Sequence, residues 1–126
     1  MQQHLFEYAV IRVVPRVERE EFLNVGLVLF CKQQRYLQTV FHLDEARLRA
    51  FCPTLDISEV QAYLTAFEKV SNGANDGGPI AKLDLPSRFR WLTATRSTIV
   101  QVSKTHPGMC DDLEKAKAKL FAQLVL

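Results

Sequence analysis

Apolar residues gather in three runs over the first third of the chain, and each run predicts a β-strand. Residues 5–14 and 25–31 carry apolar side chains at both parities, which is typical of strands buried on both faces. In residues 35–42 apolar and polar side chains alternate. Gln33-Gln34 is a short link between the second and third runs, so we expect these two strands to form an antiparallel hairpin. The partner of the first strand stays open, because residues 15–23 resemble neither a tight turn nor a helix.

Helical spacing begins after residue 43. Asp44 is placed to cap a short helix that ends before Pro53, and Asp56 and Glu59 form a capping-box-like start for a second helix that ends near Gly73. Residues 75–79 have the composition of a loop, and residues 97–103 predict a fourth strand. A last helix is expected after Asp111.

This order of elements predicts one domain over residues 1–126. Hairpin connections favour the α+β class, with a mainly antiparallel sheet of about four strands and helices packed on one face. The length of 126 residues suits a single core, and the apolar content of 48% and charged content of 24% are ordinary for a globular protein.

Charge and composition narrow the classes of function. The net charge of +2 is too small to predict nucleic-acid binding, but residues 82–104 carry five basic and one acidic side chain and form a local basic patch. No leader or membrane-spanning run is evident, so we expect a cytoplasmic protein with no membrane contact. The three cysteines contain no C-x-x-C pair, which favours reduced thiols over a zinc or redox site. No motif indicates a cofactor, a metal or a catalytic group.

The segment Ser87–Thr98 is the most unusual part of the chain, because Arg88, Arg90 and Arg96 alternate with aromatic residues and hydroxyls. One interpretation is an anion pocket where a loop enters a strand, since guanidinium and hydroxyl groups donate to phosphate or carboxylate. The other is a surface loop held by arginine–carboxylate pairs. Stacking on single-stranded nucleic acid is a less favoured third interpretation.

Other positions offer smaller signals. Arg12 lies in an apolar strand and needs either a carboxylate or a bound anion. Gly26 inside a strand indicates a bulge or a close backbone approach, and Asn24 favours a local cap or turn over a ligand contact. His106 lies in a turn, where a histidine that satisfies backbone groups is favoured over a catalytic pair with Cys110.

Several of these segments together resemble a known family. The segments are Tyr8-Ala-Val-Ile-Arg12-Val-Val-Pro15, Glu20-Glu-Phe-Leu-Asn24-Val-Gly26, Arg88-Phe-x-x-Leu92-Thr-Ala, Arg96-Ser-Thr98 and His106-x-Gly108. The chain resembles, over nearly its whole length, the bacterial family catalogued as domain of unknown function 3037. The resemblance implies a shared fold and no established activity. Through neighbours that resemble HipA-like kinases, it also points to a protein partner.

The leading hypothesis is a small binding module rather than an enzyme. Its predicted ligand site consists of Arg12, Arg88, Arg96, Ser97, Thr98 and His106, and its ligand is an anionic small molecule or an acidic or phosphorylated partner protein. On this hypothesis an Arg96→Ala variant folds normally and loses anion binding. The alternative is a structural or regulatory interaction domain that binds a kinase-like neighbour or forms a homodimer. An enzyme that uses His106 and Cys110 is a third hypothesis.

Overall fold

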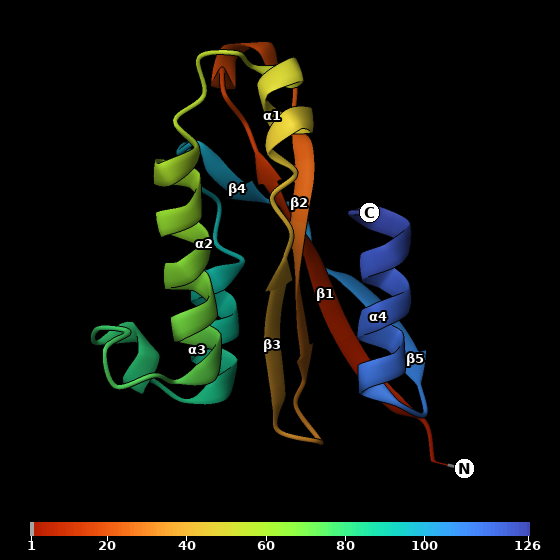
Figure 1. The fold of residues 1–126 in the computed structure, drawn as a ribbon. Helices are drawn as coiled ribbons and strands as arrows, with labels where there is room; N and C mark the ends of the chain where they lie inside the picture. The colour runs from red at the N-terminus through yellow and green to blue at the C-terminus, as the bar shows by residue number, and fades with distance from the viewer. Residues whose placement is uncertain (1) are drawn as a thin grey trace.

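The computed structural model describes residues 2–126, and Figure 1 shows a central sheet between helices. The strands are β1 (His4–Val13), β2 (Leu23–Cys31), β3 (Tyr36–Phe41), β4 (Val100–Val102) and β5 (His106–Cys110). The α-helices are α1 (Glu45–Phe51), α2 (Ile57–Asn72), α3 (Leu85–Leu92) and α4 (Leu113–Leu124). Two single turns of 3₁₀ helix, Val17–Arg19 and Ile80–Lys82, lie in the connections.

The sheet is antiparallel throughout and is organised around β1. Its order is β3-β2-β1-β4, and β5 also pairs with β1. Residues 4–8 of β1 pair with β5 and residues 11–13 pair with β4, so these two short strands follow one another along the same edge. The other edge of β1 pairs with β2. The predicted α+β class and the hairpin of the second and third strands are therefore confirmed, and the open pairing of the first strand is resolved.

Helices cover both faces of the sheet. Alternate residues of β1 and β2, including Ile11 and Val28, pack with α1, α2 and α3 in the larger core. Side chains of the opposite parity, including Phe6 and Leu29, pack with Leu113 of α4. Figure 1 shows α2 and α3 on one side of the sheet and α4 on the other. The expectation of helices on one face is thus not confirmed. Strands that are apolar at both parities need cover on both sides.

A β-bulge at Gly26 confirms the expected role of this glycine. The register of β1 and β2 shifts where Ile11 faces Gly26 and Arg12 faces Asn24, so Val25 is the extra residue. A Cβ atom at Gly26 would lie 2.8 Å from the carbonyl oxygen of Val40. Glycine is needed here because the neighbouring strand β3 approaches too closely for a side chain.

Two elements were not expected from the sequence. The Arg-rich segment begins as helix α3 rather than as a loop, and residues 106–110 form β5 rather than a turn. The sequence did not predict β5 because this strand contains Pro107 and Gly108, and both residue types are unfavourable inside strands. Gly108 lies opposite Phe6 on β1, and the Phe6 ring occupies the space that a Cβ atom would need. Strand β4 is shorter than the predicted 97–103.

No helix within residues 2–126 has the length and apolar character that crossing a membrane requires. The three cysteines are free.

Candidate functional site

Helix α3 positions the first half of the Arg-rich segment. Asp84 is its N-cap, and the Asp84 carboxylate accepts a hydrogen bond from the Ser87 amide at 2.8 Å. Pro86 occupies the first turn, where its missing N–H costs nothing. Hydrogen bonds with Ser87 hold the pKa of Asp84 below its usual value, so this carboxylate is ionised in its capping role.

Arg88 reaches from α3 to the C-terminal end of α2. Its Nη1 donates to the carbonyl oxygens of Val70 at 3.1 Å and Ser71 at 3.0 Å. Gly73, in the left-handed conformation, ends the same helix. The last carbonyls of a helix have no partner within the helix, and Arg88 satisfies two of them. The Nε atom of Arg88 is buried and has no hydrogen-bond partner within residues 2–126.

Arg96 holds the C-terminal end of α3 in the same way. Its Nη1 donates to Leu92 at 2.8 Å and to Ala94 at 3.1 Å, and its Nη2 donates to Trp91 at 2.6 Å, in each case to the carbonyl oxygen. The guanidinium also lies 4.9 Å from the ring centre of Phe67 and 4.7 Å from that of Trp91. Burial lowers the pKa of Arg96 from its usual value.

The remaining candidate residues lie elsewhere. Arg12 stacks on the ring of Phe22 at 3.9 Å and lines a separate cavity near Glu20 and Gln101. The Thr98 hydroxyl donates to the carbonyl of Val100, and Ser97 is exposed in the connection to β4.

His106 begins β5 and packs against Tyr8, with ring centres 5.3 Å apart. Cys110 is four residues further along the same strand, about 13 Å away at ~3.3 Å per residue. That distance is beyond hydrogen-bond reach, and burial raises the pKa of the Cys110 thiol, which disfavours the thiolate. The hypothesis of a His106–Cys110 catalytic pair is therefore excluded.

The arginine–carboxylate pairs of the second interpretation are not found for Arg88 and Arg96 within residues 2–126. Both side chains hydrogen-bond to main-chain carbonyls instead. The six predicted site residues do not meet in one cavity, since Arg12 and Arg88 line different ones.

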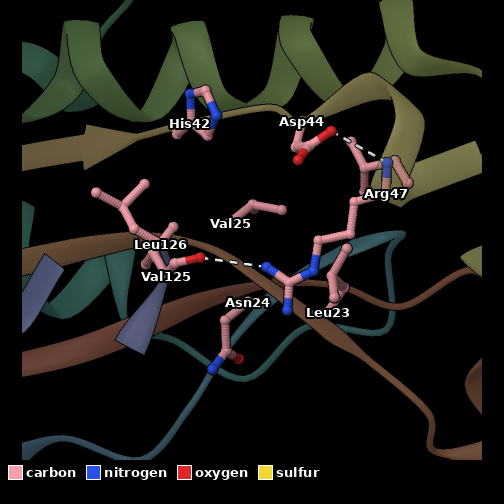
Figure 2. A pocket seen from close by; sticks show the side chains of 9 residues that line it. Leu23, Asn24, Val25, His42, Asp44, Arg47, Val125 and Leu126 are labelled. Carbon is pink, nitrogen blue, oxygen red and sulfur yellow. Dashed lines mark hydrogen bonds between the residues drawn. The ribbon is translucent and has the colours of Figure 1, made fainter. Parts of the chain in front are cut away.

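The end of α4 has a comparable arrangement. Asn24 donates through Nδ2 to the carbonyl of Leu124 at 3.1 Å. Figure 2 shows the second contact, in which Arg47 donates through Nη1 to the carbonyl of Val125 at 3.3 Å. Asp44 caps α1 by accepting from the Arg47 amide. The pocket between these residues holds about 200 Å³. Asn24 therefore makes a contact 100 residues away in sequence instead of the local cap that its position suggested.

A larger cleft opens beside Arg88, between the β2–β3 turn and the first turn of α3. Its volume is about 570 Å³. Three basic residues, three apolar residues and one acidic residue line it: Lys32, Arg35, Arg88, Phe30, Leu85, Pro86 and Asp84. We call this the hairpin–α3 cleft. Figure 1 shows the turn and α3 at the same end of the molecule.

The two turn residues of the cleft are held by backbone geometry. The Arg35 amide donates to the carbonyl of Lys32 at 3.2 Å, which closes the turn. Arg35 has a φ of 50°, a left-handed conformation that is uncommon for residues other than glycine. Neither Lys32 nor Arg35 was predicted as a site residue. The predicted hairpin placed them on either side of its Gln33-Gln34 link, but nothing in the sequence placed that link beside residues 84–88.

Fold and cleft together define an antiparallel α+β protein with arginine-capped helix ends and a basic cleft at the tip of a hairpin. Residues 8–125 match the model of the family described as Protein of unknown function (DUF3037), and the chain belongs to that family. The resemblance noted in the sequence is thereby confirmed. No curated protein and no solved structure matches the chain.

Proposed function

We propose that this protein is an anion-recognition module that binds a phosphate or carboxylate group in the hairpin–α3 cleft. The observation that carries the proposal is an excess of cations there. Lys32, Arg35 and Arg88 line the cleft with a single carboxylate, and none of the three belongs to an ion pair within residues 2–126. The one carboxylate, Asp84, is already engaged as the cap of α3.

The hydrogen bonds of Arg88 support this assignment. Both of its capping bonds use Nη1. Nε is buried, and Nη2 makes no hydrogen bond within residues 2–126, so Nη2 is the donor that remains for a charge-assisted hydrogen bond to a carboxylate or phosphate. Because Nη1 is fixed against α2, the guanidinium is already ordered, and a ligand would lose little side-chain entropy on binding it.

The proposed site keeps one of the residues expected from the sequence. Arg88 stays, and Lys32 and Arg35 join it. Arg12, Arg96, Ser97, Thr98 and His106 lie outside the lining of this cleft.

The test is calorimetric titration with inorganic phosphate and pyrophosphate. The variant Lys32→Gln/Arg35→Asn removes two positive charges from exposed positions, and asparagine tolerates the left-handed backbone at position 35. The matched control is Arg90→Gln/Lys104→Gln, which removes the same charge from exposed residues outside the cleft lining.

We expect the wild type and the control to bind alike and the cleft variant to bind at least about tenfold more weakly, since charge-assisted contacts contribute ~1.5–3 kcal/mol each. Absence of binding by the wild type at millimolar phosphate contradicts the proposal. Equal loss in both double variants also contradicts it, because the effect would then reflect overall charge.

A protein–protein contact is the second candidate function, favoured by one observation. Leu5 and Met109 face each other on β1 and β5 and are 57% and 58% exposed. Among the strands of residues 2–126, β5 pairs with β1 alone, so this apolar pair lies at a sheet edge. Sedimentation velocity over a range of concentrations tests self-association. A dimer that Met109→Lys abolishes supports this role, and a monomer at every concentration contradicts self-association.

A further inference from the structure

The hairpin–α3 cleft is larger than an isolated oxyanion requires. Its volume of about 570 Å³ falls within the range of roughly 300–1,000 Å³ that sites for whole small molecules occupy. A free phosphate has the bulk of a few water molecules, each of which takes about 30 Å³ in the liquid. Most of the cleft would therefore be left to water if the ligand were the anion alone.

Phe30 gives the cleft a rigid aromatic wall. It is the penultimate residue of β2, and its ring stacks on that of Phe89 with centres 4.7 Å apart and planes 21° from parallel. The residue is 7% exposed, so its position is fixed by the core while a small part of it borders the cleft. A wall held in this way is organised before any ligand arrives.

Leu85 and Pro86 supply further apolar surface from the first turn of α3. Both are partly exposed, and both line the cleft together with Phe30. The cap at Asp84 and the fixed φ of proline hold this turn in place. Apolar surface that stays in contact with water is unfavourable, and a ligand with an apolar body would remove it from water.

We infer that the ligand is a small molecule in which a phosphate or carboxylate is carried by an aromatic or similarly flat apolar body. This inference rests on the proposed function. Lys32, Arg35 and Arg88 bind the anionic group, and Phe30, Leu85 and Pro86 contact the body. The cleft thus combines a charged set of residues for orientation with an apolar set for affinity.

The experiment compares inorganic phosphate, methyl phosphate and phenyl phosphate, with benzoate as the carboxylate counterpart. Binding to the full chain is measured by calorimetry at a pH well above the second ionisation of each phosphate, so that their charges match. We expect phenyl phosphate to bind at least about tenfold more tightly than inorganic and methyl phosphate, a difference of about 1.4 kcal/mol.

Two variants assign this preference to the apolar wall. Leu85→Gln and Pro86→Ser each place a polar group in the wall and leave the three cations in place. We expect both to reduce the preference for phenyl phosphate and to leave the affinity for inorganic phosphate unchanged. Circular dichroism verifies that each variant is folded, and Pro86→Ser serves as the test if Leu85→Gln is not.

The possible outcomes separate this inference from the proposed function. Equal affinity for the three phosphates contradicts the inference that the ligand has an apolar body, but leaves the proposed anion recognition intact. No binding of any probe at millimolar concentration overturns both. A preference that survives in both wall variants shows that the body lies elsewhere and overturns the inference. A phosphotyrosine peptide that binds at least about tenfold more tightly than phenyl phosphate overturns the small-molecule assignment in favour of a protein segment.

Discussion

Three arginines of this protein donate hydrogen bonds to main-chain carbonyls at helix ends, and two of them, Arg88 and Arg96, donate to more than one. Arg88 and Arg96 occupy the ends of α2 and α3, and Arg47 and Asn24 occupy the end of α4. A guanidinium has five N–H donors in one plane, so one side chain can satisfy two or three carbonyls at the end of a helix. Positive charge at a helix C-terminus is also favourable because it opposes the helix dipole. These contacts explain how two of the arginines in Ser87–Thr98 lie partly buried without carboxylate partners.

Arg96→Ala tests this role directly. The substitution removes three hydrogen bonds from a charged donor and its contacts with two aromatic rings, so we expect a loss of about 2–4 kcal/mol in the free energy of unfolding. This differs from the expectation drawn from the sequence, in which the variant folds normally. Urea unfolding measures the loss.

Arg96→Lys should recover part of that loss, because lysine keeps the charge but lacks the planar fork. Arg90→Ala, a change at an exposed residue of α3, should stay within about 0.5 kcal/mol of the wild type. Equal stability of Arg96→Ala and the wild type would contradict the capping role.

Among the elements, α4 depends on residues far away in the sequence. We expect Asn24→Ala to remove one hydrogen bond of about 1 kcal/mol from its end and to raise amide hydrogen exchange in the last turn. Arg47→Ala should have a similar effect through Val125. Exchange measured by mass spectrometry after proteolysis locates the change. Faster exchange throughout the chain, rather than in the last turn of α4, would contradict a local role.

Asp84 makes the stability of α3 depend on pH. Its pKa is lowered from the usual 3.8 by hydrogen bonds with Ser87, so its contribution is complete above that value and is lost as the pH falls through the lowered pKa. Asparagine is an equally good cap and carries no charge. We therefore expect the wild type to have the larger free energy of unfolding at neutral pH. The difference from Asp84→Asn should disappear as the pH falls below 3.8 and through the lowered pKa of Asp84. Urea unfolding over a pH series measures this, and a difference that does not vary with pH would contradict it.

Strands and capped helices were predictable from the sequence because their signals are local. The apolar run of β2 and the caps Asp44 and Asp56 all lie within a few residues of the structure they specify. Helix α3 was missed because it is short and its charged and aromatic residues resembled a ligand loop. The last helix was placed correctly, but not its face of the sheet, because hydrophobic spacing does not state which surface an element covers.

At the scale of the whole molecule, helices cover both faces of the sheet, and the hairpin–α3 cleft is lined by residues of the β2–β3 turn and of α3. Figure 1 shows this turn and this helix toward the same end of the molecule. Arg88 was identifiable from sequence because of its unusual segment. Lys32 and Arg35 were not, since their place in the cleft depends on contact with an element about fifty residues away. The net charge of +2 did not indicate the site either, because acidic residues elsewhere on the chain offset the excess of cations in the cleft.

The same Asp84→Asn variant also tests the electrostatics of the whole cleft. It removes the one carboxylate from the lining and leaves Lys32, Arg35 and Arg88 unopposed. We expect phosphate to bind about two- to tenfold more tightly, as one unit charge several ångströms away near a protein surface implies. Calorimetry measures the gain. Unchanged or weaker binding would place the anion elsewhere.

Chemical-shift mapping by NMR tests the central claim most directly. Inorganic phosphate is titrated into the ¹⁵N-labelled protein, and the amide shifts of residues 2–126 are followed. The account predicts saturable shifts concentrated at residues 30–36 and 84–89, which flank the hairpin–α3 cleft. Shifts that concentrate around Arg12 or Arg16 instead, or that fail to saturate anywhere, would contradict it.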